Sequence, residues 1–329
     1  MLRQVAKFAR QRVARGAQSQ FEENAMRRHV LANMLALSGA LFFAIPVFAK
    51  PPQAAQQPPQ PSVNALEVEK VKDNLYVIRG GGGNSTVFVS SKGVVVVDAK
   101  LPGWGTPLQE KIKTLTDKPV IIVINTHSHP DHTSGNVEFP AGIDIVANEN
   151  TKKNMENMDF FKKPENAKGL PTKTFKDRMT LLSGDDRIEL YWFGAGETSG
   201  DSWVVFPALH VMDSGDAFAQ QTVTIVNTNN GGSPVTYPEM LAKAAAGIQG
   251  VDTIITGHDG IRTWQDLVTW VQFQKEFLAW VEAERTAGKT VDEATAEYKI
   301  PDRYQGYMPV EARRVKAHIQ GIYDELSKQ

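Results

Sequence analysis

A run of apolar, β-branched residues that ends in a cluster of metal-ligand side chains constrains the fold of this chain more than any other feature. The run is Val120–Ile124, and it leads through Asn125 into the heptapeptide THSHPDH at positions 126–132. A continuous apolar run of this length is typical of a strand buried on both faces. The cluster therefore follows directly on the end of a buried strand.

The spacing within the cluster suits metal binding. Imidazole and carboxylate groups are the natural ligands of zinc and similar divalent ions. His127 and His129 are two residues apart, so a turn leaving the strand can aim both side chains the same way. Asp131 and His132 follow on the next bend and would face a second position. Three of the chain's seven histidines lie here, so we predict a metal site rather than an accidental polar loop.

Other apolar runs predict an α/β fold. Val94–Val97 is β-branched throughout, and the segment 107–116, which follows it, places its apolar residues on one side of a helix. The remaining pattern predicts strands over 187–193, 202–206, 209–212 and 251–255, and helices over 237–250, 264–284 and 311–326. This order forms two halves, each with several strands before its helices. We expect sheet packed against sheet, with helices outside.

Two further candidate ligands follow predicted strands. Asp216 comes after the strand 209–212, and His258 comes after the strand 251–255. Either residue alone is more often an ordinary loop residue than a ligand. Their shared place after apolar strands, where the sites of α/β proteins gather, makes both candidates, with Asp216 able to bridge two ions. His210 is predicted inside a strand and His318 on a surface helix. Neither has other candidate ligands near it in the sequence.

The charge distribution separates the N-terminus from the rest of the chain. The 329 residues carry a net charge of −1, but positions 1–28 hold seven basic and two acidic residues, a surplus of +5. The other 301 residues therefore sum to −6. A mildly acidic body argues against a nucleic-acid partner, which would require a basic face. The absence of cysteine excludes disulfides, thiolate metal sites and cysteine nucleophiles.

The N-terminal segment resembles an export signal. Residues 1–49 contain a basic region and then an apolar run that ends in small residues, as in a secretory signal peptide. The run is also about long enough to be a membrane anchor. A Pro/Gln-rich linker at 50–63 opens directly after Ala49, which favours cleavage and hence a periplasmic or secreted protein. Membrane contact is expected only if the segment stays uncleaved. The folded domain, with its C-terminal helices, is expected over 64–329.

Taken in order, these motifs resemble the metallo-β-lactamase superfamily of binuclear metallohydrolases. The resemblance implies a four-layer αβ/βα sandwich with two zinc ions at one edge between two sheets. His127 and His129 would serve the first ion, and the second would be held by Asp131, His132 and His258, with Asp216 bridging. The features that carry the resemblance, over about residues 66–260, are Asn84-Ser85, Val97-Asp98, the His127–His132 cluster, Gly215-Asp216 and Gly257-His258.

One position departs from the family pattern. The family usually has a first-metal histidine in a Gly-x-Gly-His-Thr-x-Gly-Asp turn, and residues 194–201 keep this turn with Glu197 in the histidine's place. Glu197 can be a ligand, which makes the first site harder and more tolerant of Mn²⁺ or Fe²⁺. Alternatively the first site is weak and one ion remains, or the protein is a degenerate homologue without activity. Counting charges favours the first alternative, because three carboxylates and one hydroxide balance two divalent ions.

The resemblance predicts an exported hydrolase for a small amide, ester or thioester, similar to a β-lactamase or a lactonase. Metal coordination lowers the pKa of water, so a hydroxide can attack a carbonyl carbon at neutral pH. Asp131 would be catalytic, orienting this hydroxide and moving its proton. Asp98 and Asp201 would fix ligand imidazoles or act as turn carboxylates. The alternative function is a catalytically degenerate periplasmic metal- or ligand-binding protein. A small molecule is the expected partner, and the sequence predicts no oligomeric state.

Overall fold

The computed structural model describes residues 60–304, 306–307 and 311–328. The predicted signal or anchor at 1–49 and positions 50–59 of the predicted linker lie outside these residues. Within the described part, no helix combines the length and the apolar character that a membrane crossing needs.

The first sheet has seven strands, which neighbour one another in chain order. The first four strands are antiparallel, and the pairs from β4 to β7 are parallel. Parallel pairing needs a crossover, and helices α2 (Gly105–Lys113) and α4 (Glu149–Asn157) lie in two of these connections. The strands are β1 (Glu67–Lys72), β2 (Leu75–Arg79), β3 (Ser85–Val89), β4 (Val94–Val97), β5 (Val120–Asn125), β6 (Asp144–Asn148) and β7 (Lys173–Phe175).

The second sheet has six strands in the order β13-β12-β11-β10-β9-β8. Only β11 and β12 pair in parallel, with helix α5 (Tyr237–Gly247) in the connection between them. The carboxyl ends of these two strands therefore meet at one edge of the sheet. The strands are β8 (Arg178–Leu181), β9 (Ile188–Tyr191), β10 (Trp203–Phe206), β11 (Val211–Asp213), β12 (Thr253–Ile255) and β13 (Arg262–Thr263).

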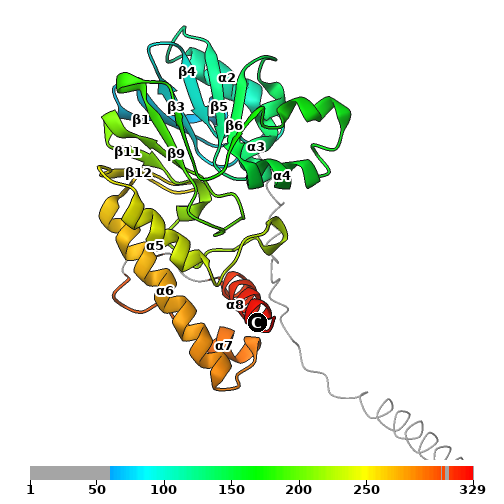
Figure 1. Ribbon diagram of the computed structural model, residues 1–329, viewed down its shortest axis with the longest axis vertical. Coiled ribbons are helices and arrows are strands. Elements are labelled where there is room, and N and C mark those ends of the chain that lie inside the picture. The colour runs from blue at the N-terminus through cyan, green and yellow to red at the C-terminus, as the bar shows by residue number, and fades with distance from the viewer. Residues whose placement is uncertain (1–59, 305, 308–310, 329) are drawn as a thin grey trace, which may run out of the picture. The chain divides into compact units, whose positions relative to one another are not determined.

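The two sheets pack face to face with helices on both outer sides (Figure 1). Strand β4 shows why, because all four of its residues are buried. Val95 and Val97 point into the core between the sheets, where Phe206 of the second sheet lies. Val96 points the other way and packs in the cluster that contains Leu108 of α2. The predicted four-layer αβ/βα sandwich is confirmed.

The C-terminal helices cover the outer face of the second sheet (Figure 1). Helix α6 (Trp264–Thr286) and helix α7 (Val291–Glu297) each begin with a capping box, formed by Thr263 and Thr290. Helix α8 (Ala312–Leu326) buries its apolar face in the same cluster. This face follows the predicted helical spacing.

Two local predictions were wrong. His210 lies in a left-handed turn outside the strand, because it ends the 3₁₀ turn Pro207–Leu209 and β11 begins only at Val211. His318 is buried rather than on the surface, because its side of α8 packs against the chain near Thr224.

Candidate metal centre

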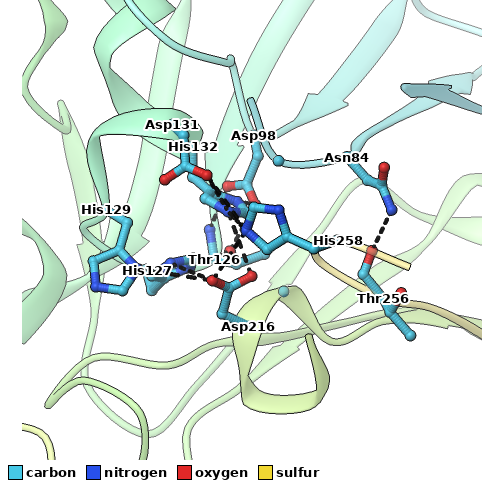
Figure 2. A network of polar contacts seen from close by, with 12 residues as sticks. Asn84, Asp98, Thr126, His127, His129, Asp131, His132, Asp216, Thr256 and His258 are labelled. Carbon is cyan, nitrogen blue, oxygen red and sulfur yellow. Dashed lines mark hydrogen bonds and ion pairs between the residues drawn. The ribbon is translucent and has the colours of Figure 1, made fainter. Parts of the chain in front are cut away.

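The strand ends of both sheets converge on one site (Figure 2). A first cluster combines His127 and His129, which follow β5, with Glu197 from the β9–β10 loop and Asp216 from the 3₁₀ turn Gly215–Phe218. One ligand atom of each of these residues lies within 4.8 Å of all the others. A second cluster of Asp131, His132 and His258 meets the same criterion. The structure thus brings all seven predicted ligands together.

A short helix explains why the histidine motif faces two positions. Helix α3 (Pro130–Thr133) starts with Pro130, whose fixed φ suits a first helical residue. His129 is still extended, with φ −61° and ψ 146°, whereas Asp131 and His132 are already helical. The chain therefore turns within the motif, and its two ends contribute to different clusters.

The second cluster has the dimensions of a tetrahedral metal site. Nε2 of His258 lies 3.3 Å from Asp131 Oδ2 and 3.3 Å from His132 Nε2, and the latter two atoms are 3.6 Å apart. Asp216 lies beside these three, with Oδ1 3.4 Å from His132 Nε2 and Oδ2 3.3 Å from His258 Nε2. Two ligands of one tetrahedral zinc ion, each bonded at about 2.0–2.1 Å, lie about 3.4 Å apart. The spacing of Asp131, His132 and His258 therefore fits a zinc-sized ion.

The first cluster is looser but contains unpaired polar atoms. His127 Nε2 lies 3.6 Å from Asp216 Oδ2, and His129 Nε2 lies 3.5 Å from Glu197 Oε1. Among the described residues, His127 Nε2, Glu197 Oε2 and Asp216 Oδ1 are buried without a hydrogen-bond partner. Leaving such atoms unpaired is costly, and a cation is the partner that suits a lone pair and two carboxylate oxygens. The donor set therefore fits a divalent ion here as well.

Burial and neighbouring charges shift the pKa values of the site's acids and bases in different directions. Burial, with Asp201 and Asp216 nearby, raises the pKa of Glu197 well above its usual range. Asp216 is also buried, but His132 and His127 hold its pKa well below the usual range. Burial opposes charge on His132, yet Asp216 and Asp98 together raise its pKa to about 10. An ion that binds His132 Nε2 would therefore displace a proton.

The two predicted supporting carboxylates differ in what they hold. Asp98 accepts hydrogen bonds from Thr126 N at 2.8 Å and Thr126 Oγ1 at 2.7 Å, and it lies 2.7 Å from His132 Nδ1. This contact leaves His132 Nε2 facing the cluster, as an imidazole-orienting role requires. Asp201 instead accepts from the backbone N and the Oγ1 of Thr198. Its geometry matches the alternative of a turn carboxylate beside Glu197.

A glycine-rich segment of the first sheet supports the second cluster. A Cβ on Gly83 would come within 2.2 Å of the His132 ring. The next residue, Asn84, donates from Nδ2 to Thr256 O and from its backbone N to Gly257 O, at 2.7 Å in both cases (Figure 2). These bonds tie the first sheet to the turn that carries His258. A Cβ on Gly257 would lie 1.9 Å from Asp216 Oδ1, so the close approach requires glycine.

Sequence reasoning missed two polar residues that support the site. Lys100 is fully buried, and its Nζ donates to Ile78 O and Gly83 O at 2.6 Å; burial lowers its pKa to about 7. Asn227 places Nδ2 3.0 Å from His129 Nε2, and its backbone N donates to Glu197 O at 2.8 Å. Lysines are rarely buried and Asn227 lies in an irregular loop, so no local pattern indicated either residue.

A pocket of about 680 Å³ adjoins the clusters. His129, Glu197, Asp216 and His258 line one part of it, and the loop 219–229 and Arg314 of α8 line the rest. Its volume lies in the range of small-molecule sites. The arrangement therefore places candidate metal ligands at the wall of a space whose size suits a small molecule.

Comparisons with known proteins point in one direction. The family model for the metallo-beta-lactamase superfamily matches residues 78–258. The chain is 26% identical over 231 residues to metallo-beta-lactamase IND-1 of Chryseobacterium indologenes, covering 66% of this chain and 90% of that protein. It is 32% identical over 166 residues to the metallo-beta-lactamase type 2 of Elizabethkingia meningoseptica, covering 46% of this chain and 61% of that protein.

Two solved structures share the fold. The stereoselective inverting sec-alkylsulfatase Pisa1 from Pseudomonas sp. superposes with a TM-score of 0.65 at 16% identity, over 79% of this chain and 50% of that one. A metallo-beta-lactamase from Pontibacter korlensis superposes with a TM-score of 0.54 at 21% identity, over 64% of this chain and 99% of that one. At these identities the likeness concerns the fold alone.

Proposed function

Because the chain belongs to the metallo-β-lactamase superfamily of metal-dependent hydrolases, we propose that it binds two divalent ions and hydrolyses a small amide, ester or thioester. The observation that carries this proposal is the pair of ligand clusters that share Asp216 and open into the pocket. A β-lactam or a lactone is the substrate type we favour. The N-terminal sequence supports export, so we propose a periplasmic or secreted enzyme.

The residues divide into two ligand sets. His127, His129 and Glu197 would hold one ion, and the other would be held by Asp131, His132 and His258, with Asp216 between them. Bound divalent ions would supply Lewis acidity and a nucleophile derived from water at neutral pH. The tetrahedral spacing of the second set favours Zn²⁺. The carboxylate of Glu197 makes the first set more tolerant of Mn²⁺ or Fe²⁺.

Asp131 is the carboxylate best placed to move a proton. Its side chain is 26% exposed, compared with 12% for Asp216 and 3% for Glu197. A proton-transfer group must reach both the reacting atoms and a route to solvent. We therefore assign the catalytic role to Asp131, and leave Glu197 and Asp216 to binding.

Two observations favour testing a binding function and a further class of substrate. Glu197 stands where the family has a histidine, and a first cluster that binds its ion weakly would leave a binding protein without catalysis. The sec-alkylsulfatase superposes on a larger share of the chain than the lactamase structure does, which adds alkyl sulfates to the substrates worth testing. Metal content and turnover separate these possibilities.

The test is elemental analysis of the purified protein, together with turnover of nitrocefin, a γ-lactone, 4-nitrophenyl butyrate, an acyl thioester and a sec-alkyl sulfate. We expect about two ions per chain and turnover of at least one amide, ester or thioester. The variant His132→Ala should lose metal binding and turnover together. His210→Ala is the control, because His210 is exposed and lies outside the clusters. At most one ion and no turnover of any compound would support the binding protein instead.

A further inference from the structure

The substrate pocket has one permanently charged side chain that the metal clusters do not use. Arg314 of α8 lines the pocket, and it is the only lysine or arginine among the described lining residues. We propose that Arg314 forms a subsite for an anionic group of the substrate, a carboxylate or a sulfate. This inference rests on the proposed function and adds a substrate class to it. Arg314 lies outside residues 78–258, so membership of the family assigns it no role.

The fold holds Arg314 at the pocket. Val315 and Ile319 bury the apolar face of α8 in the core under the second sheet. His318 lies one turn after Arg314 on the same side of the helix. Its Nδ1 is 2.5 Å from the carbonyl oxygen of Thr224, and Thr224 lines the same pocket. The position of Arg314 therefore follows from helix packing and does not depend on a flexible tether.

The guanidinium is largely free to bind a ligand. Among the described residues, its one ion pair joins Nε to Glu311 Oε2 at 3.6 Å, which is longer than a hydrogen bond. The Glu311 side chain is 70% exposed, so water screens this pair and it contributes little. Arginine stays protonated, and its planar fork matches the two oxygens of a carboxylate or sulfate. The Arg314 side chain is 31% exposed and thus reachable.

The other charges of the pocket favour a substrate with two distinct ends. Glu197 and Asp216 line the pocket beside the histidines, and both repel an anion unless cations neutralise them. An anionic group would bind with less repulsion at Arg314, while the bond to be hydrolysed lies at the clusters. A volume of about 680 Å³ accommodates a small molecule that spans both places.

Matched substrates test the proposal. The pairs are nitrocefin with its methyl ester, and 4-nitrophenyl hydrogen succinate with 4-nitrophenyl butyrate; each pair has one anionic and one neutral member. We expect Arg314→Ala to raise KM about tenfold or more for the anionic member, with kcat changed less than about twofold and the neutral member unaffected. Arg314→Lys should recover part of the loss. Arg313→Ala, on the exposed side of α8, is the control.

A binding measurement separates this inference from the proposed function. Calorimetric titration of the zinc-loaded protein with benzoate and with ethyl sulfate reports anion binding without turnover, and the tighter of the two identifies the group. We expect Arg314→Ala to weaken that binding about tenfold. Equal effects on charged and neutral substrates, or unchanged anion binding, would overturn the subsite. Absence of turnover together with Arg314-dependent binding would overturn only the hydrolytic function.

Discussion

The two ligand clusters contain the same kinds of side chain, but different parts of the fold support them. The second cluster is held by side-chain contacts from the first sheet: Asp98 orients His132, and Gly83 lies against the same ring. In the first cluster, His127 is held from the same sheet, through Thr126, but His129 and Glu197 are supported by a loop. Asn227 contacts His129, and its backbone N bonds to the carbonyl oxygen of Glu197.

This difference shows where the chain tolerates a change of ligand. The turn that carries Glu197 is held through its backbone, with Ser233 N donating to Gly196 O at 3.0 Å and Asn227 N donating to Glu197 O. Such bonds do not depend on the side chain at position 197. His132, by contrast, must offer Nδ1 to Asp98 and Nε2 to the cluster at once. Glu197, which replaces the family's histidine, therefore lies in a turn whose backbone hydrogen bonds can form with either side chain at position 197.

The largest effect is expected from a change that moves Asp216, because this residue contacts both clusters. In Gly257→Ala the new Cβ would lie 1.9 Å from Asp216 Oδ1, so this carboxylate must move. We expect both ions to be lost and turnover to fall by more than about a hundredfold, measured by elemental analysis and kinetics. Gly260→Ala, in the same turn, meets nothing within 4 Å and should retain both. Two ions in Gly257→Ala would show that Asp216 does not bridge.

Glu197→Gln sharpens the comparison by acting on the first cluster alone. An amide lacks the negative charge and is a poor ligand for zinc, so the metal content should fall from about two ions per chain to about one. Glu197→His should restore the second ion, because the backbone bonds of the turn remain. A Gln variant that keeps two ions would show that Glu197 is not a ligand, and a wild type with one ion would show that the first site is weak.

A smaller effect is expected from His318, which anchors the loop beside the first cluster. Burial lowers its pKa from 6.5 to about 4. As the pH falls below 6.5 the unfolded chain takes up a proton that the folded chain refuses until about pH 4. Stability is therefore complete above pH 6.5 and declines toward pH 4, by about 3 kcal/mol at most.

The measurement is urea unfolding of the metal-free protein at pH 7.5 and at pH 5, compared with His318→Gln. Glutamine can still donate to Thr224 O but does not titrate, so the variant should lose less stability between the two pH values. The other titrating groups, the carboxylates and the remaining histidines, contribute equally to the pH dependence of both proteins, so the difference between the two proteins reports His318 alone. Equal losses would mean that His318 is protonated, and hence charged, in the folded chain.

The sequence predicted the sheets well because their strands are uniform apolar runs. Val94–Val97 and the run at 120–124 admit hardly any other structure, and both form central strands. Short elements without a uniform apolar run were missed: β8 mixes polar and apolar side chains, and α7 has only seven residues, most of them polar or small. The prediction was wrong at His210, because the 3₁₀ turn Pro207–Leu209 delays the start of β11 to Val211.

The site was predictable where its residues follow strands and not where they come from tertiary contacts. Asp216 and His258 follow buried strands, and the family resemblance added Glu197. Asn227 and Arg314 reach the pocket from a loop and from a helix far along the chain, so their roles depend on packing that no local pattern records. The structure supplied both residues.

Each cluster draws its ligands from both sheets of the sandwich. His127, His129, Asp131 and His132 follow a strand of the first sheet, whereas Glu197, Asp216 and His258 belong to loops of the second. A bound ion is therefore a cross-link between two halves that the unfolded chain cannot reproduce. By mass action, free metal at a thousand times its dissociation constant stabilises the folded state by about 4 kcal/mol. Metal binding would therefore raise the free energy of unfolding as well as complete the site.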